Sequence, residues 1–358
     1  MAGITTTTQI SAPVNVVFQQ TLLRNAKSRA PYFVGSTAAE IMENQGTFTA
    51  KWRRIENLTP TTTALAEITG SVSFPTRTAD QPSVTDYTAT LAKYGNFIFL
   101  NEEVDLINFT GQTDKLVELM GINAGQSLNR LQRNKLEDSA SSVFAGTATT
   151  ATGVRARMSA VAVRSAVNVL QRNSAMKFTP MSMGSTNIGS SPIRDAYWGL
   201  CHVDVEEDIR DISGFVGVQQ YASQVEVAKG EFGTANGVRW VSSEEASVDA
   251  GSAGTATGTT VVGTDFRSTS NTNDLYTSIV LGMDAHGSVG LGFQHIKEIY
   301  MAGDSLPGVQ MISKPRGSAG SADPLNEVGS LGWKSWHAAE ILNPNWVRAI
   351  KSVATLYQ

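Results

Sequence analysis

The chain has 358 residues, of which 41% are hydrophobic and 17% are charged, and its formal net charge at pH 7 is −4. This length suffices for two or three domains, or for one elongated fold with insertions, and the charge excludes a surface that is basic throughout. The only cysteine, Cys201, excludes a disulfide within the chain and a zinc site built from cysteines.

Residues 1–45 predict an arm without a core of its own. Helical patterns cover residues 16–30 and 38–44, and Pro31 ends the first of them. The first thirty residues carry basic but no acidic side chains, which fits an ordinary N-terminal segment as well as contact with a polyanion. The start has no basic and apolar regions of a secretion signal, and no stretch of the chain reaches the roughly twenty apolar residues that span a bilayer. We therefore expect a soluble protein.

Residues 46–100 predict an extended β-hairpin. Strand-like stretches at 48–55 and 84–94 are rich in β-branched and aromatic residues, and prolines interrupt the stretch between them. So few large apolar residues lie near its middle that the hairpin cannot form its own core and must lie against another surface. The apolar run Phe97–Leu100 is expected to return to a packed core.

A charged cluster lies on the first of these strands, where Lys51, Arg53 and Arg54 flank Trp52. Basic residues around an aromatic side chain occur in nucleic-acid-binding sites. They equally describe a strand with a charged face that pairs with acids of a neighbouring subunit, and we favour this second interpretation.

Residues 113–145 predict one long helix of about 50 Å. Its apolar residues, three and four positions apart, would form one buried stripe; they are Leu116, Met120, Ala124, Leu128 and Leu131. Acidic residues come early in this helix and basic residues late, which complements the helix dipole.

The rest of the chain predicts further short elements of both kinds, so that the fold class is α+β. They are a helix at 154–173, an apolar strand at 197–203, a helix at 205–212 capped by Asp204, a hairpin with strands at 225–228 and 238–241, a Gly/Ser/Thr-rich insertion at 247–274, a buried element at 275–283, and two strands at 331–342 and 346–350.

None of the residues that carry chemistry forms a convincing site. Cys201, His202 and Asp204 are of the types found in nucleophilic sites, but neighbours on a strand point to opposite faces. The acidic residues at 204–211 spread around a helix instead of converging on a cation. Glycines at 287, 290 and 292 lack the order of a phosphate-binding loop, and the four histidines lack metal-ligand spacing. We therefore predict no catalytic residue, no metal and no cofactor.

Several short motifs occur in an order and spacing that can be compared with known protein families. They are Arg53-Arg54, Leu65-Ala66-Glu67, Pro75, Tyr94-Gly95-Asn96, Glu102-Glu103-Val104-Asp105, His202-Val203-Asp204, Gly230-Glu231-Phe232-Gly233, Gly237-Val238-Arg239, Gly332-Trp333-Lys334 and Leu342-Asn343-Pro344. Each motif alone is weak. Their order and spacing, over roughly residues 15–350, resemble the major capsid (coat) proteins of tailed double-stranded-DNA bacteriophages, which have the Hong Kong 97-type capsid fold, and within them a sub-family that includes short-tailed phages. Ile68 departs from the pattern, which usually has glycine there, and so does the long insertion at 247–274.

The resemblance implies a division of the chain. Residues 1–45 would be an N-terminal arm, 46–100 an extended loop over the adjacent subunit, 101–180 with 321–358 a peripheral domain, and 181–320 an axial domain. Residues 113–145 would be the spine helix of the peripheral domain, with Leu116, Met120, Leu128 and Leu131 in the core. Contacts between subunits would involve Lys51, Trp52, Arg53, Arg54, Glu67, Arg77 and Asp80.

The resemblance also implies a function without catalysis. Copies would form pentamers and hexamers that tile an icosahedral head around packaged double-stranded DNA, which they would contact only non-specifically. Further partners would be a portal, scaffolding and decoration proteins, and the shell would assemble in the cytoplasm of a bacterial host. Two alternatives remain open at this point: the shell of an encapsulating nanocompartment on the same fold, and a hydrolase that uses the Cys201–Asp211 region.

Overall fold

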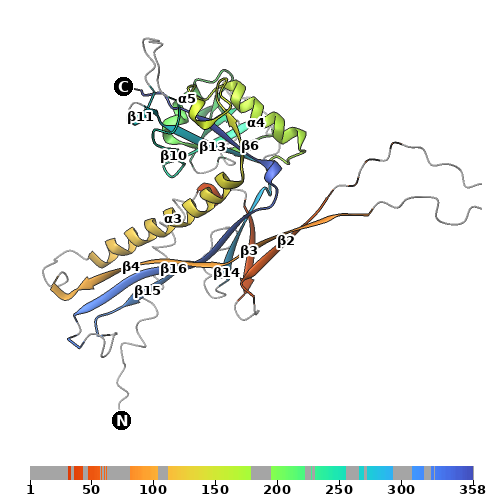
Figure 1. Cartoon of the computed structure of the whole chain (residues 1–358). Helices are drawn as coiled ribbons and strands as arrows, with labels where there is room; N and C mark the ends of the chain where they lie inside the picture. The colour runs from red at the N-terminus through yellow and green to blue at the C-terminus, as the bar shows by residue number, and fades with distance from the viewer. Residues whose placement is uncertain are drawn as a thin grey trace, which may run out of the picture.

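The computed structural model describes residues 31–33, 36–42, 47–56, 58, 60, 62, 81–103, 112–178, 195–221, 227, 230–254, 266–269, 272–292, 309–317, 324–325 and 327–357. Within these residues the chain forms two lobes that meet at a narrow waist, and a β-hairpin projects sideways from one of them (Figure 1). We name the lobes after their sheets, the eight-stranded lobe and the five-stranded lobe.

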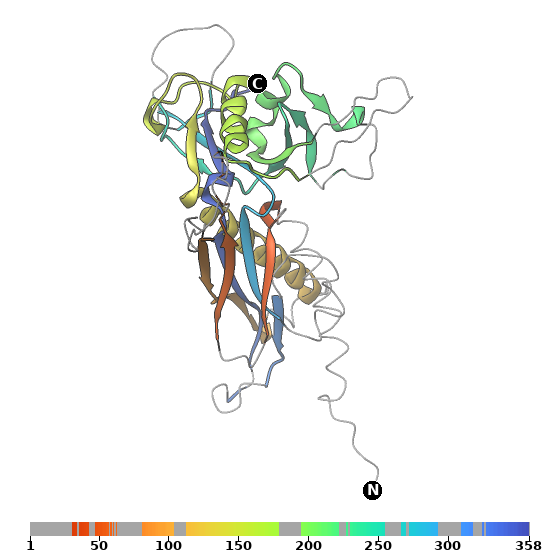
Figure 2. The same cartoon turned by 90° about the vertical axis from the view of Figure 1, so that its right-hand side faces the viewer.

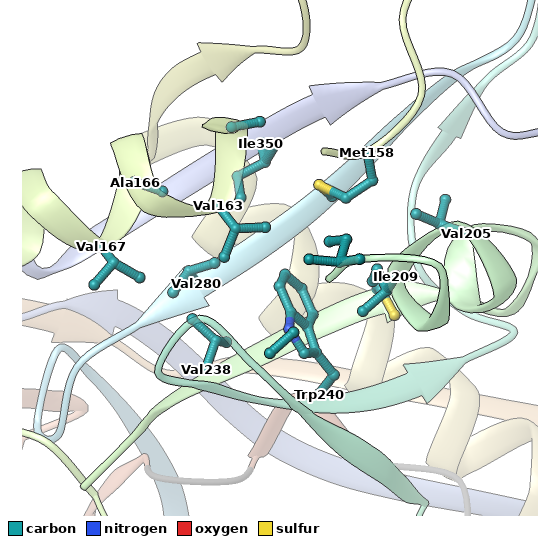
Figure 3. Packing of buried hydrophobic residues seen from close by; sticks show 14 of the residues in the cluster. Met158, Val163, Ala166, Val167, Val205, Ile209, Val238, Trp240, Val280 and Ile350 are labelled. Carbon is teal, nitrogen blue, oxygen red and sulfur yellow. The ribbon is translucent and has the colours of Figure 1, made fainter. Parts of the chain in front are cut away.

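The eight-stranded lobe is a mixed sheet with a helix layer. Its strands lie in the order β5 (Ser141–Phe144), β17 (Val347–Ser352), β13 (Leu275–Leu281), β6 (Tyr197–His202), β9 (Val238–Ser243), β8 (Glu231–Ala235) and β7 (Val216–Gly217), and β10 (Val248–Asp249) also pairs with β13. Helices α4 (Ala160–Arg172) and α5 (Glu206–Arg210) cover one face. Figure 3 shows the Trp240 side chain in this core, with Val163 of α4 and Ile209 of α5 around it.

Local sequence explains the boundaries of these elements. Ser159 caps α4, because its side chain accepts a hydrogen bond from the backbone N–H of Ala162. Asn236 and Gly237 join β8 to β9 with φ angles of 51° and 80°, the backbone conformation of a tight hairpin turn. Every residue of β13 is buried, as expected for a central strand covered on both faces.

The five-stranded lobe is built around one long strand, β16 (Val328–Ile341). On one side β16 pairs with β4 (Ala92–Asn101), and on the other with β15 (Val309–Lys314) and β14 (His286–Gly292), beyond which lies β1 (Thr37–Met42). The long helix α3 (Gln112–Ser139) packs on one face. In Figure 2, which faces the hairpin side, the strands lie in front of α3.

The waist is held by a short 3-10 helix, η1 (Pro31–Phe33). Tyr32 is buried in the core of the eight-stranded lobe, while its neighbour Phe33 is buried in the core between α3 and the five-stranded sheet. The backbone N–H of Tyr32 donates to Oδ1 of Asn129 on α3 at 3.0 Å. Two adjacent residues thus pack into both lobes.

The hairpin consists of β2 (Thr49–Ile55) and β3 (Val84–Thr90), paired antiparallel with Trp52 opposite Tyr87. The remaining short elements are η2 (Ala151–Gly153), η3 (Val203–Val205), η4 (Val218–Gln220), β11 (Ser268–Thr269), β12 (Thr272–Asn273) and η6 (Pro344–Trp346).

The structure confirms the hairpin strands, the long helix, the strand at 197–203 and the final two strands, and it corrects several boundaries. The long helix ends at Ser139 rather than 145, because residues 141–144 pair with β17 as a strand. Residues 37–42 form a strand and not the predicted helix, because pairing with β14 outweighs local helix propensity. The second helix begins at Ala160 rather than 154, at its Ser159 cap.

Two further corrections concern the eight-stranded lobe. The first strand of the predicted hairpin at 225–241 lies later, at 231–235, since the turn is at Asn236-Gly237. Asp204 is not a helix cap; the His202 side chain accepts the N–H of Asp204 instead. The predicted helix at 16–30 and residues 255–265 and 270–271 of the 247–274 insertion lie outside the described residues.

The predicted domain boundaries do not follow the sheets. Within the predicted peripheral segment 321–358, β16 belongs to the five-stranded lobe and β17 to the eight-stranded lobe. Helix α4 packs in the eight-stranded lobe, whereas β14 and β15 from the predicted axial segment lie in the five-stranded sheet. The chain crosses the waist more often than a division at 180 and 320 allows.

The stripe of α3 is largely as predicted. Met120, Ala124 and Leu128 are buried against the five-stranded sheet, while Leu116 and Leu131 at its margins are half-buried. Val117, which the prediction omitted, is fully buried in the same cluster.

Candidate assembly surfaces

The base of the hairpin is attached to its own chain. Ala50 and Ala89 pack with Leu91 against Val289 of β14, and the half-buried Trp52 ring adds to this cluster. The ring lies over Gly287, where a Cβ atom would come within 2.8 Å of it. Glycine at this position therefore lets the hairpin lie close on the sheet.

Arg54 strengthens the same attachment. Its guanidinium donates to the carbonyl oxygen of Leu342 at 3.1 Å and pairs with Glu56 at 2.5 Å. It also lies 5.3 Å from the centre of the Tyr87 ring. Trp52 and Arg54 thus face the body of their own chain.

Lys51 and Arg53 lie on the opposite, exposed face of β2. Both pair with Asp86 of β3, at 2.6 and 3.0 Å. The hydrogen bond from Arg53, helped by Lys51, holds the pKa of Asp86 below its usual range. Exposed pairs of this kind contribute little to stability. Contact of these residues with a second subunit stays a prediction, and Glu67, Arg77 and Asp80 lie outside the described residues.

Farther from the body, the hairpin exposes apolar side chains. Ile55 is 67% exposed, Leu58 55% and Val84 49%. The sequence analysis did not name these three as contact residues. The available signal was their apolar character in a segment that is otherwise rich in threonine and has no core of its own. They form an apolar surface beyond the attached base.

The five-stranded sheet also has an uncovered part. Ile98 and Leu100 of β4 pack toward α3, but the alternate residues Phe97 and Phe99 are 63% and 66% exposed on the other face. Their rings contact each other edge to face, with centroids 5.1 Å apart. The predicted return of this apolar run to a packed core therefore holds for every second residue only.

No protein-family model and no curated protein matches the chain. Solved structures do match it. The capsid of Ralstonia phage GP4 superimposes with a TM-score of 0.59 and 10% identity over 92% of this chain and 93% of that chain. The capsid of cyanophage P-SCSP1u gives 0.53 and 12% over 88% and 86%, and the head of Helicobacter pylori bacteriophage KHP40 gives 0.51 and 10% over 92% and 91%.

The chain has a phage capsid fold. The match covers nearly the whole of both chains and includes both lobes, so it is not the likeness of one domain. At 10–12% identity it concerns the fold and not individual residues.

Within this capsid fold, the residues that suggested nucleophilic chemistry do not come together. The Cys201 side chain is fully buried and its thiol points to the carbonyl oxygen of Val241 at 3.7 Å. Burial raises the thiol pKa well above its usual value, so the reactive thiolate is disfavoured. His202 lies on the other face of β6, where burial lowers its pKa. A hydrolase would also need a histidine such as His337 or His295 beside Cys201, but His337 belongs to the five-stranded sheet, and His295 lies outside the described residues.

The acidic residues at 204–211 each have partners within the chain. Asp204 accepts from Tyr276 at 2.9 Å and pairs with Arg267 at 3.1 Å. Glu206 and Glu207 pair with Arg210 on the same helix, and Asp211 with Arg157. Asp208 is buried and accepts hydrogen bonds from the backbone and hydroxyl of Thr355, at 3.0 and 2.6 Å. Asp208 thus holds Thr355, near the end of the chain, against α5.

The glycines and the possible metal ligands considered in the sequence analysis do not form a binding site either. Gly287, Gly290 and Gly292 lie on strand β14 and not in a loop. In the described part of the chain, no group of three or more histidine, cysteine, aspartate or glutamate side chains could hold a metal ion. No helix among these residues is long and apolar enough to cross a membrane.

Proposed function

We propose that this chain is the major subunit of a phage head. Copies form pentamers and hexamers, which tile an icosahedral shell around packaged double-stranded DNA. The observation that carries the proposal is the match to phage capsids over nearly the full length of both chains. In this assignment α3 is the spine helix, the five-stranded lobe the peripheral domain and the eight-stranded lobe the axial domain. The arm is the segment before η1, because η1 and β1, which the predicted arm 1–45 included, belong to the waist and to the five-stranded sheet.

The hairpin supplies the principal contact between copies. Its base is attached to β14 and β16 of its own chain, while Ile55, Leu58 and Val84 present apolar side chains away from that base. Burial of apolar area gives about 25 cal/mol per Å², so these side chains gain free energy only where another surface covers them. A neighbouring subunit in a ring supplies that surface, and many such weak contacts add up over a shell.

The charge of the chain suits enclosure of DNA without tight binding. Its net charge of −4 leaves no large excess of cations to neutralise phosphates, so DNA can move inside the shell during packaging. No reaction is required of the protein. A portal, a scaffolding protein and a decoration protein are its proposed partners, and the host cytoplasm is its proposed site of assembly.

The test is to shorten the hairpin without disturbing its base. Ile55 pairs with Val84, and the N–H of Glu56 donates to the carbonyl oxygen of Ser83 at 3.0 Å. Replacing residues 57–82 by Asn-Gly closes the hairpin just beyond this pair with a two-residue turn. The full chain should sediment as megadalton particles with shell outlines in electron micrographs, and the shortened chain as small oligomers.

A double substitution tests whether the apolar side chains at the outer end of the hairpin are what shell formation requires. I55D/V84D places charges at the outer end of the hairpin and should block shells, whereas V161D introduces a charge at an exposed valine on α4 and serves as the control. Intact shells from the shortened chain would refute the role of the hairpin. A full chain that stays a small oligomer with any added scaffold would refute the shell itself, and particles that enclose a protein cargo instead of DNA would assign a nanocompartment.

A further inference from the structure

The face of the five-stranded sheet that looks away from α3 is covered at one end only. The hairpin base covers the end that contains Val289, Trp336 and Ala338. At the other end, β4, β16 and β15 present Phe97 and Phe99, next to Gly332, Ile312 and Ser330 in register. A shallow depression of about 490 Å³ lies there, lined among others by Lys93, Phe97, Ile312 and Lys334.

All the charges on this open face are positive. The alternation of side chains along each strand places Lys93 on β4, Lys334 on β16 and Lys314 on β15 on the same face as Phe97. Along the uncovered stretch, which comprises residues 93–101 of β4, 328–336 of β16 and 310–314 of β15, no acidic residue occupies a position on this face. Glu340, farther along β16, pairs with Lys135 of α3. The ion pairs formed within the described residues use other cations, among them Lys51, Lys135 and Arg316. The open face is therefore both apolar and cationic.

Strand β4 also has an outer backbone edge with which no described strand pairs. Among the described strands, β4 pairs with β16 alone. The N–H of Glu102 donates to the carbonyl oxygen of Glu327, so the even-numbered residues of β4 exchange their hydrogen bonds with β16. The N–H and C=O groups of the odd-numbered residues, Lys93 and Phe99 among them, consequently point to the outer edge, where the N–H of Phe97 donates to Oδ1 of the adjacent Asn96 at 2.9 Å. A ten-residue edge strand of this kind is a template for strand addition.

We propose that β4 is the docking edge for an extended segment of a separate, acidic protein. The segment adds a strand to the five-stranded sheet. On the open face, its acidic side chains lie beside Lys93 and Lys334, and its apolar side chains lie beside Phe97 and Phe99. Such a partner covers the exposed rings, satisfies the edge of β4 and neutralises the lysines in one contact.

Other occupants fit this face less well. A second identical face would place lysines against lysines. Residues 1–30 contain no acidic residue, and the two described acids of the hairpin, Glu56 and Asp86, are already paired. Duplex DNA offers phosphates for the lysines but nothing apolar for two exposed rings that lie between them. An acidic, apolar-bearing protein strand matches both properties.

The probes are two nine-residue peptides with opposite charges, TTVTVTETE and TTVTVTKTK, together with their reversed sequences to allow either strand direction. Fluorescence anisotropy with the full-length chain measures their binding. We expect the acidic peptide to bind at least tenfold more tightly than the basic one. K93E/K334E should reverse this preference, and F97S/F99S should weaken binding of the acidic peptide at least fivefold.

The control is K115E, which reverses an exposed charge on α3 and should leave binding unchanged. Unchanged melting temperatures show that the variants fold, and a reversed preference is a gain that misfolding cannot produce. Equal binding of the two peptides, no binding, or an unreversed preference would overturn the proposal. Binding of the acidic peptide to free subunits but not to assembled shells would assign the face to a second copy instead. Because binding is read on the chain itself, a failure here leaves the shell assignment untouched.

Discussion

The two lobes of this chain solve the same packing problem to different degrees. In the eight-stranded lobe both faces of the sheet are covered, one by α4 and α5 and the other by Tyr32, Leu136 and their neighbours. In the five-stranded lobe α3 covers one face, and the hairpin base covers only part of the other. The closed lobe buries the apolar side chains of both sheet faces within the chain, whereas the half-covered lobe keeps apolar surface for contacts outside the chain.

The largest expected effect breaks the closed lobe from within. Glu231 and Arg239 form a buried ion pair at 2.6 Å, and Tyr221 donates to the same carboxylate at 2.8 Å. E231Q removes the negative charge from this buried pair and should lower the free energy of unfolding by about 3–5 kcal/mol. Urea denaturation measures it. E56Q removes an acid from the exposed hairpin pair and should lower the free energy of unfolding far less. Equal losses in the two variants would show that the closed lobe is not more sensitive.

The next effect separates α3 from the sheet that it covers. Leu128 is fully buried between them, so L128A should cost about 2–5 kcal/mol. Hydrogen exchange should accelerate in β15 and β16 and stay unchanged in β6 and β13. L119A, at an exposed position of the same helix, should change stability by no more than about 0.5 kcal/mol. Faster exchange throughout both sheets would mean that the lobes unfold as one unit.

Lowering the pH should destabilise the five-stranded lobe more than the eight-stranded lobe. Burial lowers the pKa of His286 and of His337 from 6.5 to about 4, and both lie in the five-stranded sheet. The unfolded chain therefore binds more protons than the folded chain between these values, and stability falls as pH drops below 6.5. By pH 5 each histidine should cost about 2 kcal/mol. Exchange of β14 and β16 amides at pH 7 and 5 measures the loss, and H286Q/H337Q should flatten its pH dependence.

The smallest effect tests the open face. Phe99 is 66% exposed, so F99S should change stability by no more than about 0.5 kcal/mol. F33A, at a buried phenylalanine of the same lobe, should cost about 3–5 kcal/mol. Thermal unfolding of the two variants gives the comparison. A large loss in F99S would mean that this face is packed within the chain and is not available to a partner.

Local patterns predicted the elements of this fold better than their partners. The period of the apolar residues located α3, and the β-branched stretches located β2 and β3, because these signals depend on neighbours in sequence. The predicted end of the long helix at residue 145 and the predicted helix at 38–44 were wrong. Residues 141–144 pair with β17, and residues 37–42 pair with β14, so strand pairing decides both structures. No local signal reports such distant pairing, which also decides how the chain divides into lobes.

The candidate surfaces show the same limit. The charged stretch around Trp52 was recognised, but only the structure shows that Arg54 turns to Leu342 while Lys51 and Arg53 turn to Asp86. Phe97 and Phe99 were expected in the core, because a short apolar run looks alike in a strand covered on one face and in one covered on both. Three-dimensional coverage, and not composition, distinguishes the two cases.

The pair Tyr32 and Phe33 has a mechanical consequence. One peptide bond joins two side chains that are buried in different lobes, so a change in the angle between the lobes must pull at least one of them out of its pocket. A load applied to the chain just before Pro31 is therefore shared by both lobes at once. A binding partner that pulls on the first thirty residues could therefore change the angle between the two lobes.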